Sequence, residues 1–354
     1  MTEASAPAAG QGTFGVVDVG GTKIAAGIAA ATEILDTRRL STDALRGPDD
    51  IVDRIARTLS ELRSTPGLAP MSAVGLSVPG PLDRRRGVVH FTPNLLWQHY
   101  PVAAELSQRL GGIPVLIDDD ANCAAAGEAW QGAGRGFRHL VCLTIGTGIG
   151  GAIIIDGALV HGHQDLAGEI GHMAVVPDGP PCACGHSGCL EAVASGSAIR
   201  RLGAALLTQN EAPVLARLAR SHGGEVRANL VFQAAAGGDQ ACQALLDKVA
   251  EHLGAAVASL IQILNPQAVV LGGGVMGEEN AARLLPAIQA KMNQHLFEVQ
   301  RGAVQVVRGE LGDLAGLWGA LQLVTTGCPR GQACLDTVHG AEGLAGPHHA
   351  GGGR

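Results

Sequence analysis

The chain has 354 residues, of which 46% are apolar and 3% aromatic, and its formal net charge is −7. This length can hold one large or two medium domains with an ample core, and the 52 glycines are typical of a compact α/β protein with many tight turns. The acidic balance disfavours a nucleic-acid partner, because binding to a phosphate backbone depends on many Lys and Arg contacts. A small anionic ligand needs only a local pocket and is not excluded.

The sequence carries no sign of export or of membrane insertion. Residues 1–12 (MTEASAPAAGQG) lack the basic start and apolar run of a signal peptide, and no apolar run approaches about 18 residues. We therefore expect a cytoplasmic protein with no membrane partner, in which residues 1–12 are a disordered tail. In that compartment, clustered cysteines indicate a metal site or a catalytic site rather than disulfides.

Two segments far apart in the chain share one pattern. Residues 14–30 and residues 139–155 each read as a short apolar strand, a glycine-rich turn and a second apolar strand. Their repetition predicts two related halves that open with the same hairpin. We accordingly expect a smaller α/β domain over residues 13–120 and a larger one over residues 121–310.

Helical and strand patterns alternate after the first hairpin. The sequence predicts an amphipathic helix over about Asp50–Arg63 and a buried strand at Ala73–Val78. A second buried strand, Pro114–Ile117, runs into three aspartates and a helix from Ala121 to about Gln131. This order of elements favours helices packed on a sheet.

The second half continues the alternation. A long helix is predicted over Asp239–Leu264 and ends at Asn265-Pro266, because proline cannot continue a helix. The strand Ala268–Leu271 follows. A last helix is expected over residues 311–326, packing back on the first domain, and residues 327–354 are expected to be a disordered tail. The pattern predicts mainly parallel sheets, with an antiparallel hairpin at the front of each half.

Both hairpin turns have the composition of phosphate-binding loops, although neither is a Walker loop or a dinucleotide fingerprint. Consecutive glycines let backbone N–H groups approach phosphate oxygens, while Thr22 can donate a hydroxyl, Lys23 supplies positive charge and Asp18 can hold a hydrated Mg²⁺. If the two hairpins face each other, they can bind a triphosphate from both sides. A third glycine turn, Gly272–Gly274, would suit adenosine. The alternative for each is an ordinary turn. The candidate ATP-binding residues are Asp18, Gly20, Gly21, Thr22, Lys23, Thr144, Gly146, Thr147, Gly148, Gly150, Gly272, Gly273 and Gly274.

Three consecutive aspartates, Asp118, Asp119 and Asp120, end a buried strand and open an alanine-rich helix. One acidic residue there is an ordinary helix N-cap, but three exceed what capping needs. A carboxylate in this position can take a proton from a substrate hydroxyl, and in phosphoryl transfer it mainly orients the nucleophile. Asn94, in a polar loop after a proline, either binds a pair of hydroxyl groups or forms a turn.

The segment Gly168–Glu191, GEIGHMAVVPDGPPCACGHSGCLE, concentrates metal-binding side chains. His172, Cys182, Cys184 and Cys189 can close a tetrahedral Cys₃His zinc site, which is structural because it leaves no open position. His186 is the competing nitrogen ligand. Glu169 and Glu191 flank these residues, so one metal would bring two carboxylates together. The second nitrogen of a zinc-bound imidazole stays free to bind a sugar hydroxyl.

These motifs together resemble the ROK group, which comprises repressors, open reading frames and sugar kinases, and within it the ATP-dependent glucokinases. GEIGH at 168–172 and CxCGxxGCLE at 182–191 are the most specific part of the resemblance, which covers roughly residues 14–326. DVGGTK at 18–23, LTIGTGIGG at 143–151, VVLGGGV at 269–275 and FTPNLLW at 91–97 are similar to the family's phosphate, adenosine and sugar segments.

The resemblance implies a two-domain actin-like ATPase fold, related to ribonuclease H, with a zinc-binding insertion. It implies phosphorylation of a hexose by ATP, most simply of glucose to glucose 6-phosphate, with Mg²⁺ and structural Zn²⁺ as cofactors. Asp120 takes the position of the catalytic base, and homodimers or homotetramers are the expected assembly. The implied sugar-binding residues are Asn94, Asp119, Asp120, Glu169, His172 and Glu191, and the implied zinc ligands are His172, Cys182, Cys184 and Cys189.

One position departs from the family pattern, and three other functions stay open. Asp119 stands where the family usually has Asn, which puts an acceptor-only group and a second negative charge beside the base. An N-acetylglucosamine or N-acetylmannosamine kinase would use the same machinery. A ROK-type regulator would need a DNA-binding segment, and only about a dozen residues precede the first strand. A zinc-stabilised binding protein without turnover would have damaged phosphate loops.

Overall fold

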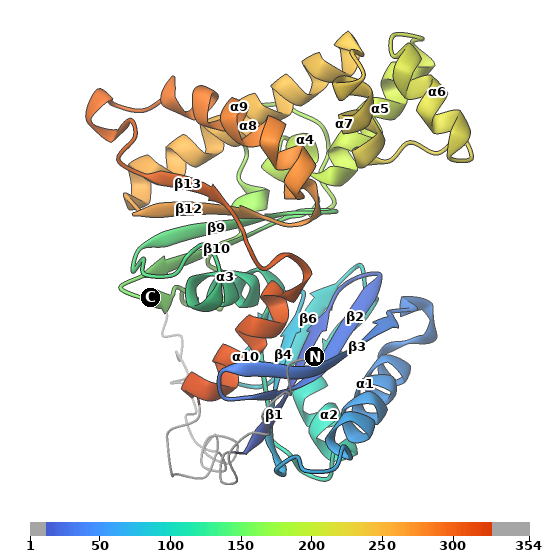
Figure 1. Ribbon diagram of the computed structural model, residues 1–354, viewed down its shortest axis with the longest axis vertical. Helices are drawn as coiled ribbons and strands as arrows, with labels where there is room; N and C mark the ends of the chain where they lie inside the picture. The colour runs from blue at the N-terminus through green and yellow to red at the C-terminus, as the bar shows by residue number, and fades with distance from the viewer. Residues whose placement is uncertain (1–11, 328–354) are drawn as a thin grey trace, which may run out of the picture.

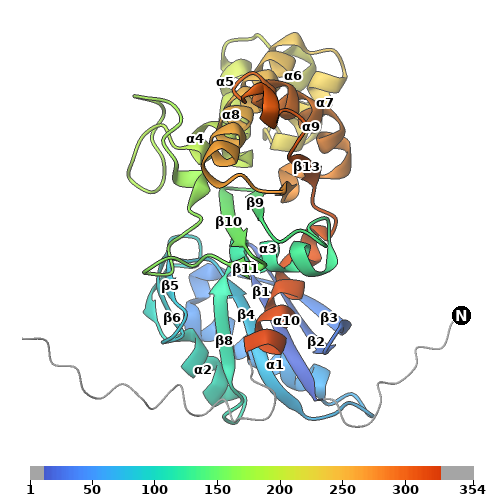
Figure 2. The same cartoon turned by 90° about the vertical axis from the view of Figure 1, so that its left-hand side faces the viewer.

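The computed structural model describes residues 12–327, which form two sheet-centred halves joined by a pair of helices (Figure 1, Figure 2). The two tails predicted from the sequence lie outside the described residues, apart from Gly12 and Gly327 at their edges. Within residues 12–327, no helix combines the length and the apolar character that crossing a bilayer requires.

The first half contains a five-stranded sheet in the order β3-β2-β1-β4-β8. The strands are β1 (Thr13–Val19), β2 (Lys23–Ala30), β3 (Glu33–Ser41), β4 (Met71–Val78) and β8 (Val115–Asp119). β1, β2 and β3 pair antiparallel, whereas β4 runs parallel to β1 and β8 runs parallel to β4. Helices α1 (Pro48–Arg63) and α2 (Val102–Arg109) cover one face, and α1 is the predicted amphipathic helix, with its apolar side chains Ile51, Ile55 and Leu59 fully buried.

A small sheet adds to the first half. It consists of β5 (Leu82–Asp83), β6 (Val88–Thr92) and β7 (Trp97–Tyr100), paired antiparallel. Trp97 on β7 is 1% exposed and joins the core under α1 and α2. The connection between β6 and β7 carries Asn94, so this sheet fixes one of the candidate sugar-binding residues.

The second half repeats the topology of the first sheet, in the order β11-β10-β9-β12-β13. The strands are β9 (Leu140–Ile145), β10 (Ile149–Ile155), β11 (Ala158–Leu159), β12 (Ala268–Gly272) and β13 (Gln305–Arg308). The outer face is covered by helices α4 (Leu190–Ala194), α5 (Gly196–Thr208), α6 (Pro213–Ser221), α7 (Ala228–Ala236), α8 (Gln240–Leu264) and α9 (Glu278–Asn293). Short 3₁₀ turns lie at Ala44–Arg46, Ile170–His172, Gly274–Met276, Glu298–Gln300 and Gly312–Leu314.

Helices α3 (Asp120–Gln131) and α10 (Ala315–Gly327) lie between the two sheets (Figure 1). α3 packs on β9 and β10 of the second sheet, while α10 packs on β1 and β4 of the first. The two helices approach so closely that a Cβ on Gly319 would come within 1.8 Å of the Cys123 carbonyl oxygen. Trp130 and Trp318 stack edge to face at the same contact, with ring centroids 5.7 Å apart. This helix pair is the packed connection between the halves.

Most predicted elements are present, with two corrections. Both hairpins form, and α8 ends at Asn265, whose left-handed conformation stops the helix before Pro266. The last helix begins at Ala315 rather than at residue 311, because Gly312 has a positive φ of 54°, which an α-helix does not contain. The sheets are not mainly parallel: β3 and β11 each extend a hairpin, so each five-stranded sheet has two antiparallel and two parallel pairs, and the small sheet β5-β6-β7 is antiparallel. Division of the chain into domains at residues 120 and 310 stays a prediction.

Candidate active site

The residues predicted to bind a sugar line one cavity of about 500 Å³ between the two halves. The tip of the β9–β10 hairpin forms one wall, and the start of α3 forms another. The segment that begins at Glu169 and ends at Glu191 closes the cavity on the side of the cysteine cluster. The cavity contains Gly21, Thr22, Asn94, Asp119, Asp120, Thr144, Gly146, Thr147, Gly148, Gly150, Glu169, His172 and Glu191. The fold therefore brings together all six candidate sugar-binding residues.

The remaining candidate ATP residues line two adjoining cavities. One, of about 280 Å³, contains Asp18, Gly20, Lys23, Asp120, Thr144, Gly272 and Gly273. The other, of about 370 Å³, contains Gly146, Thr147 and Gly274. Gly273 has a positive φ of 86°, and a Cβ there would lie 2.5 Å from the Ile145 carbonyl oxygen, so the third glycine turn is pressed against the second hairpin. The three glycine-rich segments thus follow one another around a continuous hollow.

The aspartates are positioned by the junction between β8 and α3. Asp119 ends the strand and caps the helix: its Oδ1 accepts a hydrogen bond from the Ala121 N–H at 3.0 Å. Its Oδ2 accepts a second from the Gly80 N–H at 3.1 Å. Asp120 is the first helical residue and lines both the sugar-side cavity and the cavity of the first phosphate loop. The N-cap interpretation therefore holds for Asp119, while Asp120 stays open to a ligand.

Burial and mutual repulsion change the acidity of these groups. Burial, followed by the charges of Asp119 and Asp18, raises the pKa of Asp120 well above its usual range. Burial also raises the pKa of Asp119 to about 6, with a further contribution from Glu169 and against the hydrogen bond from Ala121. The pKa of Asp18 is raised chiefly by burial, although a hydrogen bond from Ser77 Oγ at 2.6 Å opposes the rise. Because a raised pKa makes a carboxylate a stronger base, Asp120 is suited to accept a proton.

Four side chains of the Gly168–Glu191 segment form the predicted metal cluster. The ligand atoms of His172, Cys182, Cys184 and Cys189 all lie within 4.8 Å of one another. Cys182 Sγ is 3.7 Å from His172 Nδ1, and Cys184 Sγ is 3.7 Å from Cys189 Sγ. Zinc bonds to sulfur and nitrogen place tetrahedral donors about 3.5–3.8 Å apart, so the set fits Zn²⁺ in both chemistry and spacing. His186 lies 3.5 Å from Cys184 Sγ but outside the four-residue cluster.

Glu191 connects this cluster to the second phosphate hairpin. Its Oε2 accepts a hydrogen bond from the Ile149 N–H at 2.9 Å, and its Oε1 lies 3.7 Å from Cys182 Sγ. Glu169 precedes the single 3₁₀ turn Ile170–His172, and His172 is its last residue. Both line the sugar-side cavity together with Glu191.

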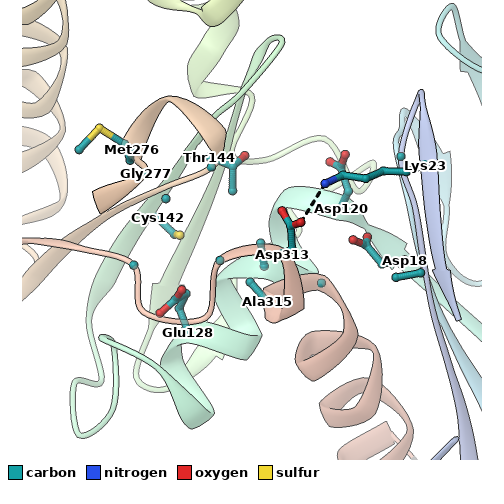
Figure 3. Close-up of a pocket in the computed structure, with 18 of the residues that line it drawn as sticks. Asp18, Lys23, Asp120, Glu128, Cys142, Thr144, Met276, Gly277, Asp313 and Ala315 are labelled. Atoms are coloured by element: carbon teal, nitrogen blue, oxygen red, sulfur yellow. Dashed lines mark hydrogen bonds and ion pairs between the residues drawn. The ribbon is translucent and has the colours of Figure 1, made fainter. Parts of the chain in front are cut away.

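Lys23 is paired with a residue that the sequence did not mark. Its Nζ lies 2.9 Å from Asp313 Oδ2, and Arg39 Nη1 lies 3.3 Å from the same oxygen. Figure 3 shows Asp18, Lys23 and Asp120 around one space, with Lys23 linked to Asp313. Asp313 has no motif around it and reaches the site only because the chain returns from β13 to α10.

Glu128 is a second residue that sequence reasoning missed. It is 3% exposed and lines the 280 Å³ cavity, and it accepts hydrogen bonds from the backbone N–H groups of Ala133, Glu310 and Leu311. It thereby ties the segment between β13 and α10 to the end of α3. The available signal was a single glutamate within residues 123–130 of α3, CAAAGEAW, which are otherwise apolar.

A sequence model of the ROK family matches residues 14–327. The chain belongs to the ROK family. A glucokinase of Thermotoga maritima is 37% identical to it over 310 residues, which cover 87% of this chain and 96% of the relative. A glucokinase of Streptomyces coelicolor is 37% identical over 314 residues, which cover 87% and 96%. A solved ROK family glucokinase from Streptomyces griseus, in complex with glucose and AMPPNP, aligns with a TM-score of 0.76 at 37% identity and covers 88% of this chain and 99% of that one.

Membership of the family also settles the fold class. The ROK sugar kinases have the actin-like ATPase fold, and the two halves with the same strand order β3-β2-β1-β4-β8 and β11-β10-β9-β12-β13 are its two repeats. The fold predicted from the motifs is therefore confirmed.

Proposed function

We propose that this protein transfers the γ-phosphoryl group of ATP to the 6-hydroxyl group of glucose. The observation that carries the proposal is the place of Asp120, which lines both the cavity with the candidate sugar residues and the cavity with the first phosphate loop. A carboxylate that orients the acceptor hydroxyl must reach the sugar on one side and the γ-phosphoryl group on the other. The glucokinase relatives and the relative solved with glucose and an ATP analogue support the same assignment.

Asp120 orients the acceptor hydroxyl and accepts its proton. Its carboxylate accepts a hydrogen bond from the sugar O6–H and receives that proton as the new O6–P bond forms and the bond from phosphorus to the bridging oxygen of ADP breaks. Because the transition state is loose, orientation of O6 matters more than proton removal. The raised pKa of Asp120 favours acceptance of the proton once the bond forms.

The other polar residues of the 500 Å³ cavity bind the sugar. Glu169, Glu191 and Asp119 offer carboxylate oxygens as acceptors for hydroxyl groups, and His172 and Asn94 offer groups that can donate. A cavity with this many acceptors suits a polyhydroxylated ligand, since each buried hydroxyl needs a partner. The hexose is thereby held against Asp120 at the start of α3.

The glycine turns bind the triphosphate, and Asp18 would hold the Mg²⁺ that accompanies it. Backbone N–H groups at residues 20–21 and 146–148 approach the phosphates, and Thr22 and Lys23 add a hydroxyl and a charge. To reach the phosphates, Lys23 must break its ion pair with Asp313. Mg²⁺, when bound, neutralises charge on the phosphate oxygens. Asp18 has the oxygen ligands that Mg²⁺ prefers and lies in the same cavity as Asp120.

The Cys₃His cluster has a structural role in this scheme. Zinc, when bound, cross-links His172 to the three cysteines and needs no further ligand. Since Glu191 lies beside Cys182 and binds the Ile149 N–H, the cluster fixes the sugar-side wall. His172 keeps one ring nitrogen for the sugar.

The test is ADP release with glucose, mannose, fructose, N-acetylglucosamine and N-acetylmannosamine as acceptors. The proposal predicts the highest kcat/KM with glucose. A higher value with an N-acetylhexosamine would replace the substrate, and no ADP release with any of the sugars would refute a kinase. A cytoplasmic location and a homodimeric or homotetrameric assembly stay predictions from the sequence.

A further inference from the structure

An ionic cluster around the buried Asp118, two residues before Asp120, links the two halves. The side chain of Asp118 is 3% exposed. Its Oδ2 accepts a hydrogen bond from His161 Nε2 at 2.9 Å and lies 3.0 Å from Arg84 Nε. Arg84 follows β5 in the first half, whereas His161 follows β11 in the second. Asp118 is therefore held from both sides of the cleft.

The other oxygen of Asp118 acts on residues of the sugar-side cavity. Oδ1 accepts hydrogen bonds from the Asp119 N–H at 2.8 Å and from Asn122 Nδ2 at 3.0 Å. Asp119 and Asn122 line the 500 Å³ cavity together with Asp120. Asp118, Arg84 and His161 line a separate cavity of about 540 Å³. The Asp118 carboxylate thus links residues that line the two cavities.

Backbone groups of Arg84 and His161 hold the loop that leads to Glu169. The backbone oxygen of His161 accepts a hydrogen bond from the Ala167 N–H at 3.1 Å, which closes the loop. The Arg84 N–H donates to Asp165 Oδ2 at 3.3 Å. Asp165 and Ala167 line the sugar-side cavity, and Glu169 follows immediately along the chain. The hydrogen bond between the His161 ring and Asp118 therefore connects this loop to Asp119 and Asn122 at the start of α3.

The charges in the cluster favour an ionised Asp118. Burial acts to raise the pKa of Asp118, but the hydrogen bond from His161 and the charge of Arg84 outweigh it and hold the pKa below its usual range. An ionised carboxylate only accepts hydrogen bonds, so His161 Nε2 must carry its proton and the amide nitrogen of Asn122 must face Asp118. The cluster consequently fixes the orientation of both partners.

We propose that Asp118 is a positioning residue for the hexose site: Arg84 and His161 hold its carboxylate, and that carboxylate orients Asp119 and Asn122 and anchors the loop before Glu169. The proposal rests on the proposed kinase function. It adds that hexose affinity depends on a contact between the halves that lies outside the hexose cavity. Among the described residues, the side chains of Asp118, Arg84 and His161 form no hydrogen bond or ion pair with residues 18–23 or 144–151, so we expect ATP binding to depend on the cluster less than hexose binding does.

The experiment compares His161→Leu with His161→Gln in the full chain. Glucose affinity is measured by calorimetry without ATP, and KM for glucose and KM for ATP are measured from ADP release. His161→Leu should weaken glucose binding by about tenfold, the effect of one hydrogen bond to a charged group, and leave KM for ATP unchanged. His161→Gln keeps a neutral N–H donor and should recover most of the affinity.

Two control variants separate positioning from stability. His139→Leu removes the histidine of another His–Asp pair, His139–Asp156 at 3.5 Å, and should leave both KM values unchanged. Asp118→Asn should weaken glucose binding, whereas Asp239→Asn, at a buried aspartate that caps α8, should lower only the melting temperature.

Each outcome decides the proposal. Equal losses of affinity in the Leu and Gln variants, in step with their melting temperatures, would mean that His161 only stabilises the fold and would overturn it. Unchanged glucose affinity in His161→Leu would overturn it too. Failure of the unmodified protein to bind or phosphorylate any hexose would instead refute the proposed function, and this proposal with it.

Discussion

Glu191 accepts a hydrogen bond from the backbone N–H of Ile149 at 2.9 Å, which joins the cysteine-rich segment to the second phosphate hairpin. Its other oxygen lies 3.7 Å from Cys182 Sγ. One carboxylate thus lies between the metal cluster, the hexose cavity and the hairpin that faces the triphosphate. Through this contact, a metal bound at the Cys₃His cluster would affect the affinity for a sugar even without an open coordination position.

Removal of zinc should therefore cost hexose affinity first. Chelation frees His172 and Cys182, so the wall of the 500 Å³ cavity loses its cross-link. Residues 18–23 of the first phosphate loop stay held by the pairing of β1 with β2 in the first sheet. We expect glucose binding, measured by calorimetry, to weaken by at least about tenfold, the lower end of the losses in activity that follow from disturbing the surroundings of a metal site. ATP binding should change less. Chelated protein that kept glucose affinity and lost ATP would contradict the roles given to this segment.

Gly148→Ala should displace Glu191 without removing it. A Cβ at this position would lie 2.2 Å from Glu191 Oε2, so the carboxylate must leave the Ile149 N–H. We expect about a tenfold loss of glucose affinity in the absence of ATP, since the bond is to a charged group. Gly146→Ala is the matched control, because a Cβ there meets nothing within 4 Å, and glucose affinity should be preserved. Equal effects of the two variants would argue against the steric explanation.

Asp119→Asn should move the acidic limb of the pH profile. Burial and then the Asp119 charge raise the pKa of Asp120, so removal of that charge lowers the pKa. Asp120 then keeps its proton-accepting form to lower pH, and the fall of kcat/KM on acidification shifts to lower pH. We also expect a changed ranking of hexoses, because the amide nitrogen would face the Gly80 N–H where a carboxylate oxygen now accepts it. An unmoved acidic limb and an unchanged ranking would remove Asp119 from the site.

The contact between α3 and α10 should tolerate an added methyl group poorly. Gly319→Ala would place a methyl group 1.8 Å from the Cys123 carbonyl oxygen, and the backbone of α3 cannot move away without disturbing the Asp120 end. We expect destabilisation by about 2–4 kcal/mol, measured as the free energy of unfolding in urea, from overpacking of a close contact. Thr326→Ala on an exposed position of α10 should change it by less than about 1 kcal/mol. An unchanged free energy of unfolding in Gly319→Ala would mean that the two helices can move apart at little cost.

The sequence allowed prediction of the elements and residues that carry short-range signals. Glycine turns between apolar strands identified both hairpins, and the Cys₃His spacing identified a cluster whose four ligand atoms meet in the structure. The resemblance to the ROK family then placed Asn94, Asp120, Glu169 and Glu191 in one cavity, although they come from four segments. These features depend on local composition or on a family motif.

Features that depend on long-range packing were missed. Asp313 meets Lys23 only because the chain crosses back from β13 to α10, and no pattern near Asp313 indicates that return. Glu128 binds backbone groups more than 180 residues away in sequence, at Glu310 and Leu311. Similarly, Arg84 and His161 come from loops without periodicity and meet at Asp118. In each case a charged side chain has partners far away in the sequence, which sequence spacing does not reveal.

The most direct test of the central claim is the Asp120→Asn variant, with glucose binding and phosphoryl transfer measured on the same preparation. The asparagine keeps the size of the side chain but cannot accept the O6 proton as a base. The proposed function predicts glucose affinity close to that of the unmodified protein and a kcat lower by at least about 100-fold, the usual contribution of a positioned base. Turnover near normal in a variant that binds glucose would contradict the account.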